Sequence, residues 1–213
     1  MRRVTLSFDN GPDPDVTPHV LDLLRERELR AHFYVLGKHL ATPAGRRLVE
    51  RARDEGHLIG NHSYTHETPL GADPRPDAVA QEIVRTEALL APLVPGPRRF
   101  RPFGGGGLLG RHLLSPAARD YLVAHGYSCI LWNAVPRDWD DPGWVSTALA
   151  QTAARDHAVV VLHDVPSACL DGLPAFLDAL LARGDDLTQD LPPECVPIAS
   201  GRITANLSEI VNA

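Results

Sequence analysis

The sequence predicts an α/β fold in which strands and helices alternate and the strands pair in parallel. Short apolar runs rich in β-branched residues recur between longer amphipathic stretches, which is typical of a parallel sheet with right-handed crossovers. A polar cluster follows each of several apolar runs, and the carboxyl ends of parallel strands meet at one rim. A barrel or partial barrel satisfies both observations, and the length of 213 residues suits a single domain over 1–213.

The first strand is expected at 4–8, where the run Val-Thr-Leu-Ser-Phe ends abruptly at Asp9-Asn10-Gly11-Pro12. Pro43 to Glu55 is expected to be helical, with Thr42 as its N-cap and Gly56 as its C-cap. The tail 185–213 is polar and contains prolines, and no element is predicted there. The remaining strands are expected at 31–36, 57–60, 127–133 and 157–162, and the remaining helices at 17–29, 77–93, 116–125, 145–154 and 173–182.

Composition and charge exclude several classes of partner. The net charge is −6, from 21 basic and 27 acidic residues, and no basic block disturbs this balance, so neither a nucleic-acid surface nor a polybasic membrane anchor is expected. The first strand begins too close to Met1 to leave room for a secretory signal, which predicts a cytoplasmic protein. Cys129, Cys169 and Cys195 are an odd, widely spaced set, which favours neither a disulfide framework nor a thiolate zinc site. No oligomeric state is predicted.

His62 and His66 are the first candidates for metal ligands. On a helical turn, histidines four residues apart face the same way, as ligands of one divalent cation must. Such a pair also arises by chance in a chain with 10 histidines. A zinc site with an open position needs three protein ligands, and the third could be the side-chain oxygen of Asn10 or the carboxylate of Asp9.

Four further residues suit proton transfer beside such a site. A carboxylate at Asp9 that is left free could take a proton from water, and His163, at the end of the last apolar strand, could donate one to a leaving group. Arg101 is a candidate partner for a buried carboxylate. Asp138 could keep His163 protonated, since a nearby carboxylate raises the pKa of an imidazole.

Five motifs in order along the chain resemble those of the polysaccharide deacetylases, the NodB-homology group of carbohydrate esterase family 4. They are Ser-Phe-Asp-Asn-Gly-Pro, Gly-Asn-His-Ser-Tyr-Thr-His, Phe-Arg-Pro-Phe-Gly, Arg-Asp-Trp and Val-Leu-His-Asp. The resemblance spans about residues 4–165. It implies a distorted (β/α) barrel of about seven parallel strands and a metal-dependent hydrolase that removes N-acetyl, sometimes O-acetyl, groups from an amino sugar or oligosaccharide.

The resemblance also implies roles for individual residues. Asn10, His62 and His66 stand at metal-ligand positions, where zinc is expected first and cobalt, nickel or manganese are alternatives. Metal-bound water would be the nucleophile. The catalytic positions of the family fall on Asp9 as general base, Arg101 as its partner, His163 as general acid and Asp138 as the support of that histidine.

The positions that contact substrate differ most from the family pattern. Trp139 matches a wall of the acetyl pocket, and Val161 replaces the usual leucine. The usual Arg-Pro-Pro-Tyr-Gly motif is Arg-Pro-Phe-Gly-Gly here, so that Phe103 and Gly104 replace Pro and Tyr, and the Gly104 N–H could serve an oxyanion hole. Asn10 replaces the second aspartate of the first motif, which leaves the metal site with one fewer negative charge.

The sequence therefore predicts a hydrolase of C–N bonds other than peptide bonds, acting on an acetylated amino sugar or a small amide. Two alternatives remain open. One is a different, metal-independent C–N amide hydrolase on the same scaffold, which the departures at Asn10 and in the glycine run favour. The other is a non-catalytic sugar-binding module, which the presence of a complete set of acid, base and their partners disfavours.

Overall fold

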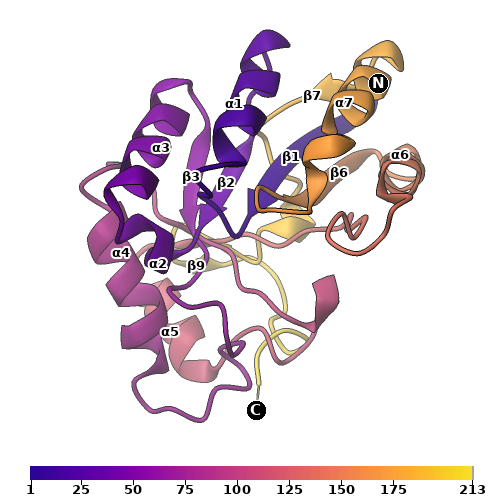
Figure 1. Ribbon diagram of the computed structural model, residues 1–213. Helices are drawn as coiled ribbons and strands as arrows, with labels where there is room; N and C mark the ends of the chain where they lie inside the picture. Colours follow the sequence, from indigo (N-terminus) through magenta and orange to yellow (C-terminus); the bar gives the residue numbers. More distant parts are fainter. Residues whose placement is uncertain (213) are drawn as a thin grey trace.

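A mostly parallel sheet runs through the centre of the protein (Figure 1), whose computed structural model describes residues 1–212. The strands are ordered β6-β1-β2-β3-β4-β5-β8-β9, and β7 also pairs with β1. The pairings from β1 to β7 are all parallel, which confirms the predicted seven parallel strands, whereas β8 and β9 pair antiparallel. The strands are β1 (Arg3–Asp9), β2 (His32–Val35), β3 (Leu58–Asn61), β4 (Arg99–Phe100), β5 (Ser128–Cys129), β6 (His157–His163), β7 (Asp186–Leu187), β8 (Ile198–Ala199) and β9 (Arg202–Ile203).

The chain after β5 closes the curl of the sheet. The Asn133 and Ala134 N–H groups donate to the Val159 carbonyl, and the Val161 N–H donates back to the Ala134 carbonyl. One segment therefore pairs with β4 at its start and with β6 at its end. The sheet is a strongly curled, mostly parallel half-barrel in a single domain, as the distorted-barrel prediction requires.

Alternation along β1 divides the interior into two parts. Val4, Leu6 and Phe8 belong to the core between the sheet and the helices, whereas Ser7 and Asp9 point to the inside of the curl. Figure 1 shows α1 and α3 on the flank of β1–β3, and α6 and α7 beside β6. The helices are α1 (Thr17–Glu26), α2 (Gly37–Leu40), α3 (Pro43–Asp54), α4 (Arg85–Leu90), α5 (Pro116–Ala124), α6 (Trp144–Ala153) and α7 (Leu173–Ala182).

The predicted N-cap of α3 is confirmed, since Thr42 Oγ1 accepts from the Gly45 N–H; the C-cap is Glu55, and Gly56, with φ 87°, is the left-handed residue that follows it. The helix expected at 77–93 is different: a π-helical turn, η1 (Ala80–Val84), precedes a short α4. Shorter 3₁₀ turns occur at η2 (Gly105–Gly107), η3 (Cys169–Asp171) and η4 (Pro193–Cys195).

Three strands, β7, β8 and β9, lie within residues 185–212, where no element was predicted. The Asp186 N–H donates to the Arg2 carbonyl, and the Thr188 N–H donates to the Val4 carbonyl. Asp186 of β7 pairs with Arg3 of β1, and Ile198 of β8 pairs with Cys129 of β5, so local periodicity reveals neither pairing.

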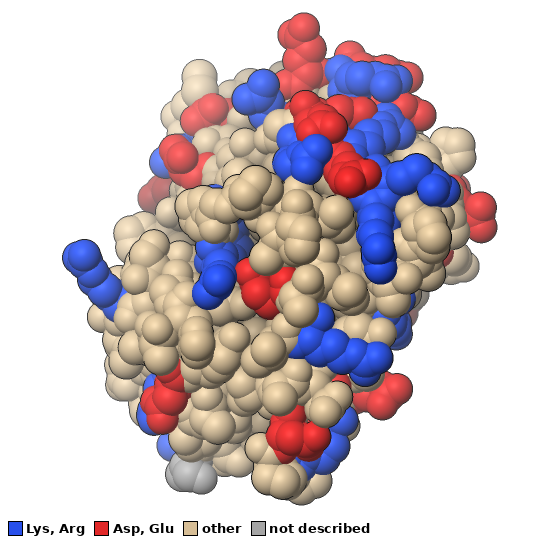
Figure 2. Space-filling view, turned by 90° about the vertical axis from the view of Figure 1, so that its left-hand side faces the viewer, with Lys and Arg blue, Asp and Glu red and all other residues tan. Residues whose placement is uncertain are grey.

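The surface over α1 to α4 carries both signs of charge. Figure 2 shows blue and red side chains intermingled there, mainly in the upper half where α1 and α3 lie. Arg51 of α3 contributes to this pattern, with bonds to Asp22 of α1 at 2.7 Å and to Glu55 at 2.6 Å. The longest α-helix within residues 1–212 is α3 with 12 residues, and none there is long and apolar enough to cross a membrane.

Candidate active site

The register of the parallel strands brings the predicted site residues to one rim. Asp9, the last residue of β1, is the direct cross-strand partner of His163, the last residue of β6. On the next strands Asn61 pairs with Phe100, so the residues that follow them, His62 and Arg101, emerge at the same level. Chemically active groups from four strands therefore meet at the carboxyl end of the sheet.

A cavity of about 280 Å³ opens at this rim. Arg101 and Asp138, the two predicted residues absent from its wall, lie directly behind Asp9 and His163. Trp132 and Val165 contribute further wall that the sequence analysis did not predict. The predicted residues that line the cavity are Asp9, Asn10, His62, His66, Phe103, Gly104, Trp139, Val161 and His163.

The two histidines lie in an irregular loop, and the expectation of a helical turn is wrong. Ser63 and His66 have φ values of 74° and 61°, which no helix contains. The loop nevertheless brings the rings of His62 and His66 together, with centroids 5.1 Å apart. The left-handed residues turn the chain back on itself, and this turn brings the two imidazoles together as a helical turn was expected to.

Both imidazoles are held in a form that can bind a metal ion. His62 donates its Nδ1–H to the Arg101 carbonyl at 2.8 Å, which leaves the Nε2 lone pair free. The ring of His66 stacks on Phe103 with centroids 3.9 Å apart. Burial lowers the pKa of both imidazoles, and with the neighbouring His62 it lowers that of His66 to about 3. Neutral imidazole is the form that ligates a metal.

Asn10 is the candidate for a third ligand. Its backbone is left-handed at φ 75°, and its Oδ1 is buried without a hydrogen-bond partner among residues 1–212. A buried oxygen left in this way needs a partner, and a cation is a suitable one. Within the same residues no group of three His, Cys, Asp or Glu side chains is arranged to hold a metal ion, so a three-ligand site at this rim would include a donor of another kind, such as this amide oxygen. The donor set of two imidazoles and one oxygen fits a catalytic divalent site.

Asp9 is hydrogen-bonded to Arg101, which argues against its use as the third ligand. Its Oδ1 accepts from Arg101 Nη1 at 2.9 Å, while its Oδ2 lies 3.6 Å from His62 Nε2. Arg101 is fully buried, and it also donates to Ser7 Oγ at 2.6 Å and lies over the ring of Tyr34 at 3.9 Å. Burial alone raises the pKa of Asp9, but the charge and hydrogen bond of Arg101 and the charge of His163 outweigh it and hold that pKa below its usual value. Asp9 is therefore an ionised carboxylate beside the candidate ligands.

The pKa of His163 is shifted in the opposite direction to that of Asp9. Its Nδ1–H donates to Asp138 Oδ1 at 2.8 Å, and its backbone N–H donates to Oδ2 of the same carboxylate, also at 2.8 Å. Burial lowers the pKa of His163, but Asp138 more than compensates and the pKa is raised. The indole of Trp139 stands edge-on to the imidazole at 4.9 Å. The protonated form of the ring is thus favoured, and Nε2 is available to the cavity.

Replacing Asp138 with Asn removes the charge that keeps His163 protonated. The pKa of His163 is then expected to fall, so the basic limb of the kcat/KM profile moves to lower pH, and kcat falls on the order of 10²-fold. The measurement is a pH–rate profile of both proteins, with Asp140→Asn on the exposed side of the same loop as the control. An unmoved basic limb would mean that the group titrating there is not His163.

The glycine run forms one rim of the cavity. Residues 104–107 all have positive φ (129°, 60°, 59° and 86°), conformations that side chains other than glycine adopt only at a cost. Trp132 Nε1 donates to the Gly107 carbonyl at 2.6 Å and ties the run to the barrel. A Cβ at Gly104 would meet Pro69 Cγ at 2.7 Å, so the backbone packs against Pro69 more closely than a residue with a side chain would allow.

Several supporting residues were missed by the sequence analysis. Ser7 and Tyr34 hold Arg101 in the barrel, and their only signal is alternation to the inner face of their strands. Asp164 is buried against Gly11, where a Cβ would lie 2.2 Å from its Oδ2, and accepts from Thr17 Oγ1 at 2.6 Å. Burial raises the pKa of Asp164 to about 7. Asp164 ends the Val-Leu-His-Asp motif, but nothing in that motif predicts its burial or its contact with Thr17.

Comparison with known proteins connects this geometry to a family. A profile of the polysaccharide deacetylases matches residues 1–128. A chitooligosaccharide deacetylase from Rhizobium leguminosarum bv. trifolii is 34% identical over 205 residues, covering 87% of this chain and 89% of the relative. A peptidoglycan-N-acetylglucosamine deacetylase from Bacillus cereus is 32% identical over 164 residues, covering 76% and 72%.

A comparison of the fold with solved structures points to the same family. The structure of a family 4 acetyl xylan esterase from Clostridium thermocellum, solved in complex with a cobalt ion, superposes with a TM-score of 0.70. It is 26% identical, and the match covers 88% of this chain and 87% of that one. Profile, relatives and fold agree over most of the chain, which therefore belongs to the polysaccharide deacetylases, hydrolases that remove acetyl groups from carbohydrates.

Proposed function

We propose that this protein hydrolyses the N-acetyl group of N-acetylglucosamine units in a soluble chitooligosaccharide. The observation that carries the proposal is that Asp9, whose lowered pKa favours the ionised form, and its cross-strand neighbour His163, whose raised pKa favours the protonated form, line one cavity together with the candidate ligands Asn10, His62 and His66. The relative from Rhizobium leguminosarum bv. trifolii, similar over nearly its whole length, supports the choice of substrate.

A divalent cation held by Asn10, His62 and His66 is part of the proposal, with zinc first and cobalt, nickel or manganese as alternatives. The buried, unpartnered Asn10 oxygen and the neutral imidazoles support it. The cobalt complex of the Clostridium thermocellum esterase, which has a similar fold, supports a divalent cation in this protein. When bound, such a cation supplies Lewis-acid polarisation of the acetyl carbonyl and lowers the pKa of water.

The chain's own residues supply the proton transfers. Asp9, ionised and anchored by Arg101, accepts a proton from the attacking water. His163 then gives its Nε2 proton to the sugar nitrogen as the C–N bond breaks, so that a free amine and acetate leave. The two residues therefore divide the acid and base roles according to their opposite pKa shifts.

The remaining cavity residues would fit the acetyl group. Trp139 and Val161 give the methyl group an apolar wall, and Phe103 shields the cavity side of His66 from water. The Gly104 backbone N–H is proposed as the donor to the developing oxyanion, in place of the N–H of the tyrosine that stands there in the family.

The experiment is incubation of the zinc-loaded protein with fully acetylated chitotetraose, followed by quantification of acetate and free amine. We expect one amine for each acetate. Acetyl xylan serves as the ester substrate in a parallel reaction. Acetate released only from acetyl xylan would mean that the activity is O-deacetylation rather than N-deacetylation. Acetate released from neither substrate would favour the non-catalytic sugar-binding alternative.

Replacing Asn10 with Asp is expected to tighten zinc binding by roughly tenfold or more, equivalent to ~1.4 kcal/mol. A carboxylate is a stronger donor than an amide oxygen, and Asp tolerates the left-handed backbone at this position nearly as well as Asn does. Zinc titration into the metal-free proteins measures the change. Equal affinities would show that residue 10 does not contact the metal.

A further inference from the structure

The loop that carries the two histidines needs support from outside itself. Ser63 and His66 adopt left-handed conformations, which cost free energy in residues other than glycine. Two imidazoles bind one cation tightly only if their backbones are held within a fraction of an ångström of the productive geometry. Residues 62–66 therefore need to be fixed by another part of the protein.

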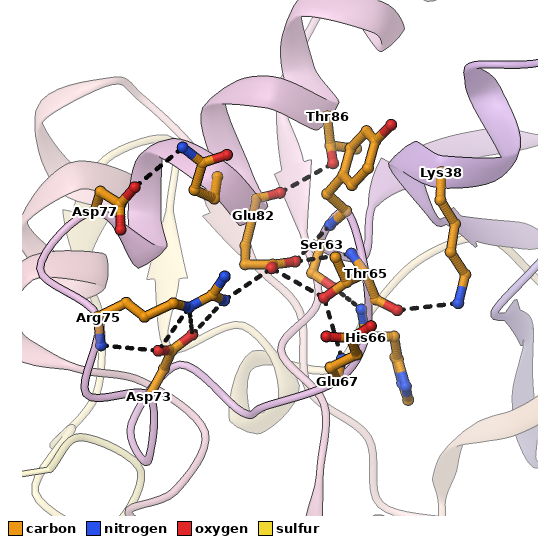
Figure 3. Close-up of polar contacts among 12 residues, drawn as sticks. Lys38, Ser63, Thr65, His66, Glu67, Asp73, Arg75, Asp77, Glu82 and Thr86 are labelled. Atoms are coloured by element: carbon orange, nitrogen blue, oxygen red, sulfur yellow. Dashed lines mark hydrogen bonds and ion pairs between the residues drawn. The ribbon is translucent and has the colours of Figure 1, made fainter.

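Glu82 fixes this loop from the neighbouring helical segment. Its side chain is buried, with 1% exposure, and points from the helix toward the loop (Figure 3). Oε2 accepts from the backbone N–H of Tyr64 at 3.0 Å and from that of Thr65 at 2.8 Å, while Oε1 accepts from Thr65 Oγ1 at 2.9 Å. One carboxylate thus makes three bonds to the two residues that precede His66.

Hydrogen bonds hold both the side chain and the backbone of Glu82. Arg75 Nη2 donates to its Oε1 at 3.0 Å and compensates the buried charge, and Thr86 Oγ1 donates to its backbone carbonyl at 2.9 Å. The π-helical turn η1, with Glu82 at its centre, is an irregularity that occurs often at functional sites. Its next carbonyl, that of Ile83, accepts from Asn61 Nδ2 at 3.0 Å, so the turn is also tied to the residue before His62.

We infer that Glu82 is a positioning residue that sets the metal affinity of the site by fixing the backbone between His62 and His66. The inference rests on the proposed metal site. A carboxylate is required because both of its oxygens accept hydrogen bonds at once. A glutamine would retain one acceptor and turn an NH2 group toward the loop N–H groups or toward Arg75, which are donors.

The test is the zinc affinity of Glu82→Gln, measured by titration of the metal-free protein in competition with a chromogenic chelator. We expect the dissociation constant to rise roughly 10- to 100-fold, the usual effect of removing a group that orients a ligand. The absorption spectrum of the cobalt-loaded variant should change as well, because it reports the arrangement of the ligands. Glu87→Gln is the matched control: Glu87 lies on the following helix α4 and pairs with Arg98 at 3.3 Å, away from the loop, and its dissociation constant should match the wild type.

A merely structural role gives a different result. In that case Glu82→Gln lowers the melting temperature of the metal-free protein but keeps the wild-type dissociation constant and cobalt spectrum, and the inference is overturned. If Glu82→Gln does not fold, Thr65→Val decides, since it removes one of the three bonds and should weaken zinc binding by a smaller factor; unchanged binding there overturns the inference. A wild-type protein that does not bind zinc contradicts the metal site itself, which distinguishes the two failures.

Discussion

Replacing Asp9 with Asn is expected to lower kcat by about 10²- to 10⁴-fold while zinc binding persists. Asn has nearly the same shape, so Arg101 and the ligands keep their places, but its amide oxygen cannot accept the proton from water. The carboxylate sits in the wall of the cavity, with its Oδ2 3.6 Å from His62 Nε2 and its Oδ1 bound to Arg101. This variant should therefore lose catalytic rate but keep its affinity for zinc.

The measurement combines acetate release under saturating substrate with the zinc content of the same sample. Asp15→Asn is the control, since Asp15 is an exposed aspartate in the same β1–α1 connection and should keep full activity. If Asp9→Asn lost its zinc, and excess zinc then restored the rate, Asp9 would be a ligand and the base would be another group.

Replacing Arg101 with Met is expected to lower the free energy of unfolding by about 3–5 kcal/mol, the usual cost of leaving one partner of a buried ion pair alone. Arg101 is fully buried and supports Asp9, Ser7 and the ring of Tyr34 at once. Met has a similar length but no charge. Without Arg101 the effect of burial on Asp9 is less opposed, so the pKa of Asp9 rises and the acidic limb of kcat/KM moves to higher pH.

Urea denaturation followed by circular dichroism measures the stability, and the pH–rate profile measures the second effect. Arg137→Met is the matched control, because Arg137 pairs with Asp140 on the surface and should hardly change stability. The double variant Asp9→Asn with Arg101→Met should be more stable than the sum of the single effects implies, since no charge is then left unpaired. Strict additivity would mean that the two side chains are not coupled.

The parts of the site that could be predicted from the sequence are those that follow regular strands. The apolar runs at 4–8 and 157–162 predict two buried strands, and in a parallel sheet their ends, at Asp9 and His163, must lie at one rim. Strand pairing then explains why Arg101, 92 positions after Asp9, reaches it inside the barrel. The family motifs supplied the roles, which stay predictions, as does the cytoplasmic location.

The parts that could not be predicted depend on contacts between distant or irregular segments. The spacing of His62 and His66 fits a helical turn, but the left-handed residues Ser63 and His66 produce the same convergence in a loop. The pattern of 77–93 is that of one amphipathic helix, yet η1 interrupts it where Glu82 turns toward that loop. Local periodicity contains no signal for either, because both result from hydrogen bonds made across the fold.

The most direct test of the central claim is acetate release from acetylated chitotetraose by protein stripped of metal, before and after addition of zinc. A site built on Asn10, His62 and His66 predicts that turnover disappears on stripping and returns fully with one equivalent of zinc per chain. Full turnover by the stripped protein would contradict the account, and a metal-independent amide hydrolase that uses Asp9 and His163 alone would take its place.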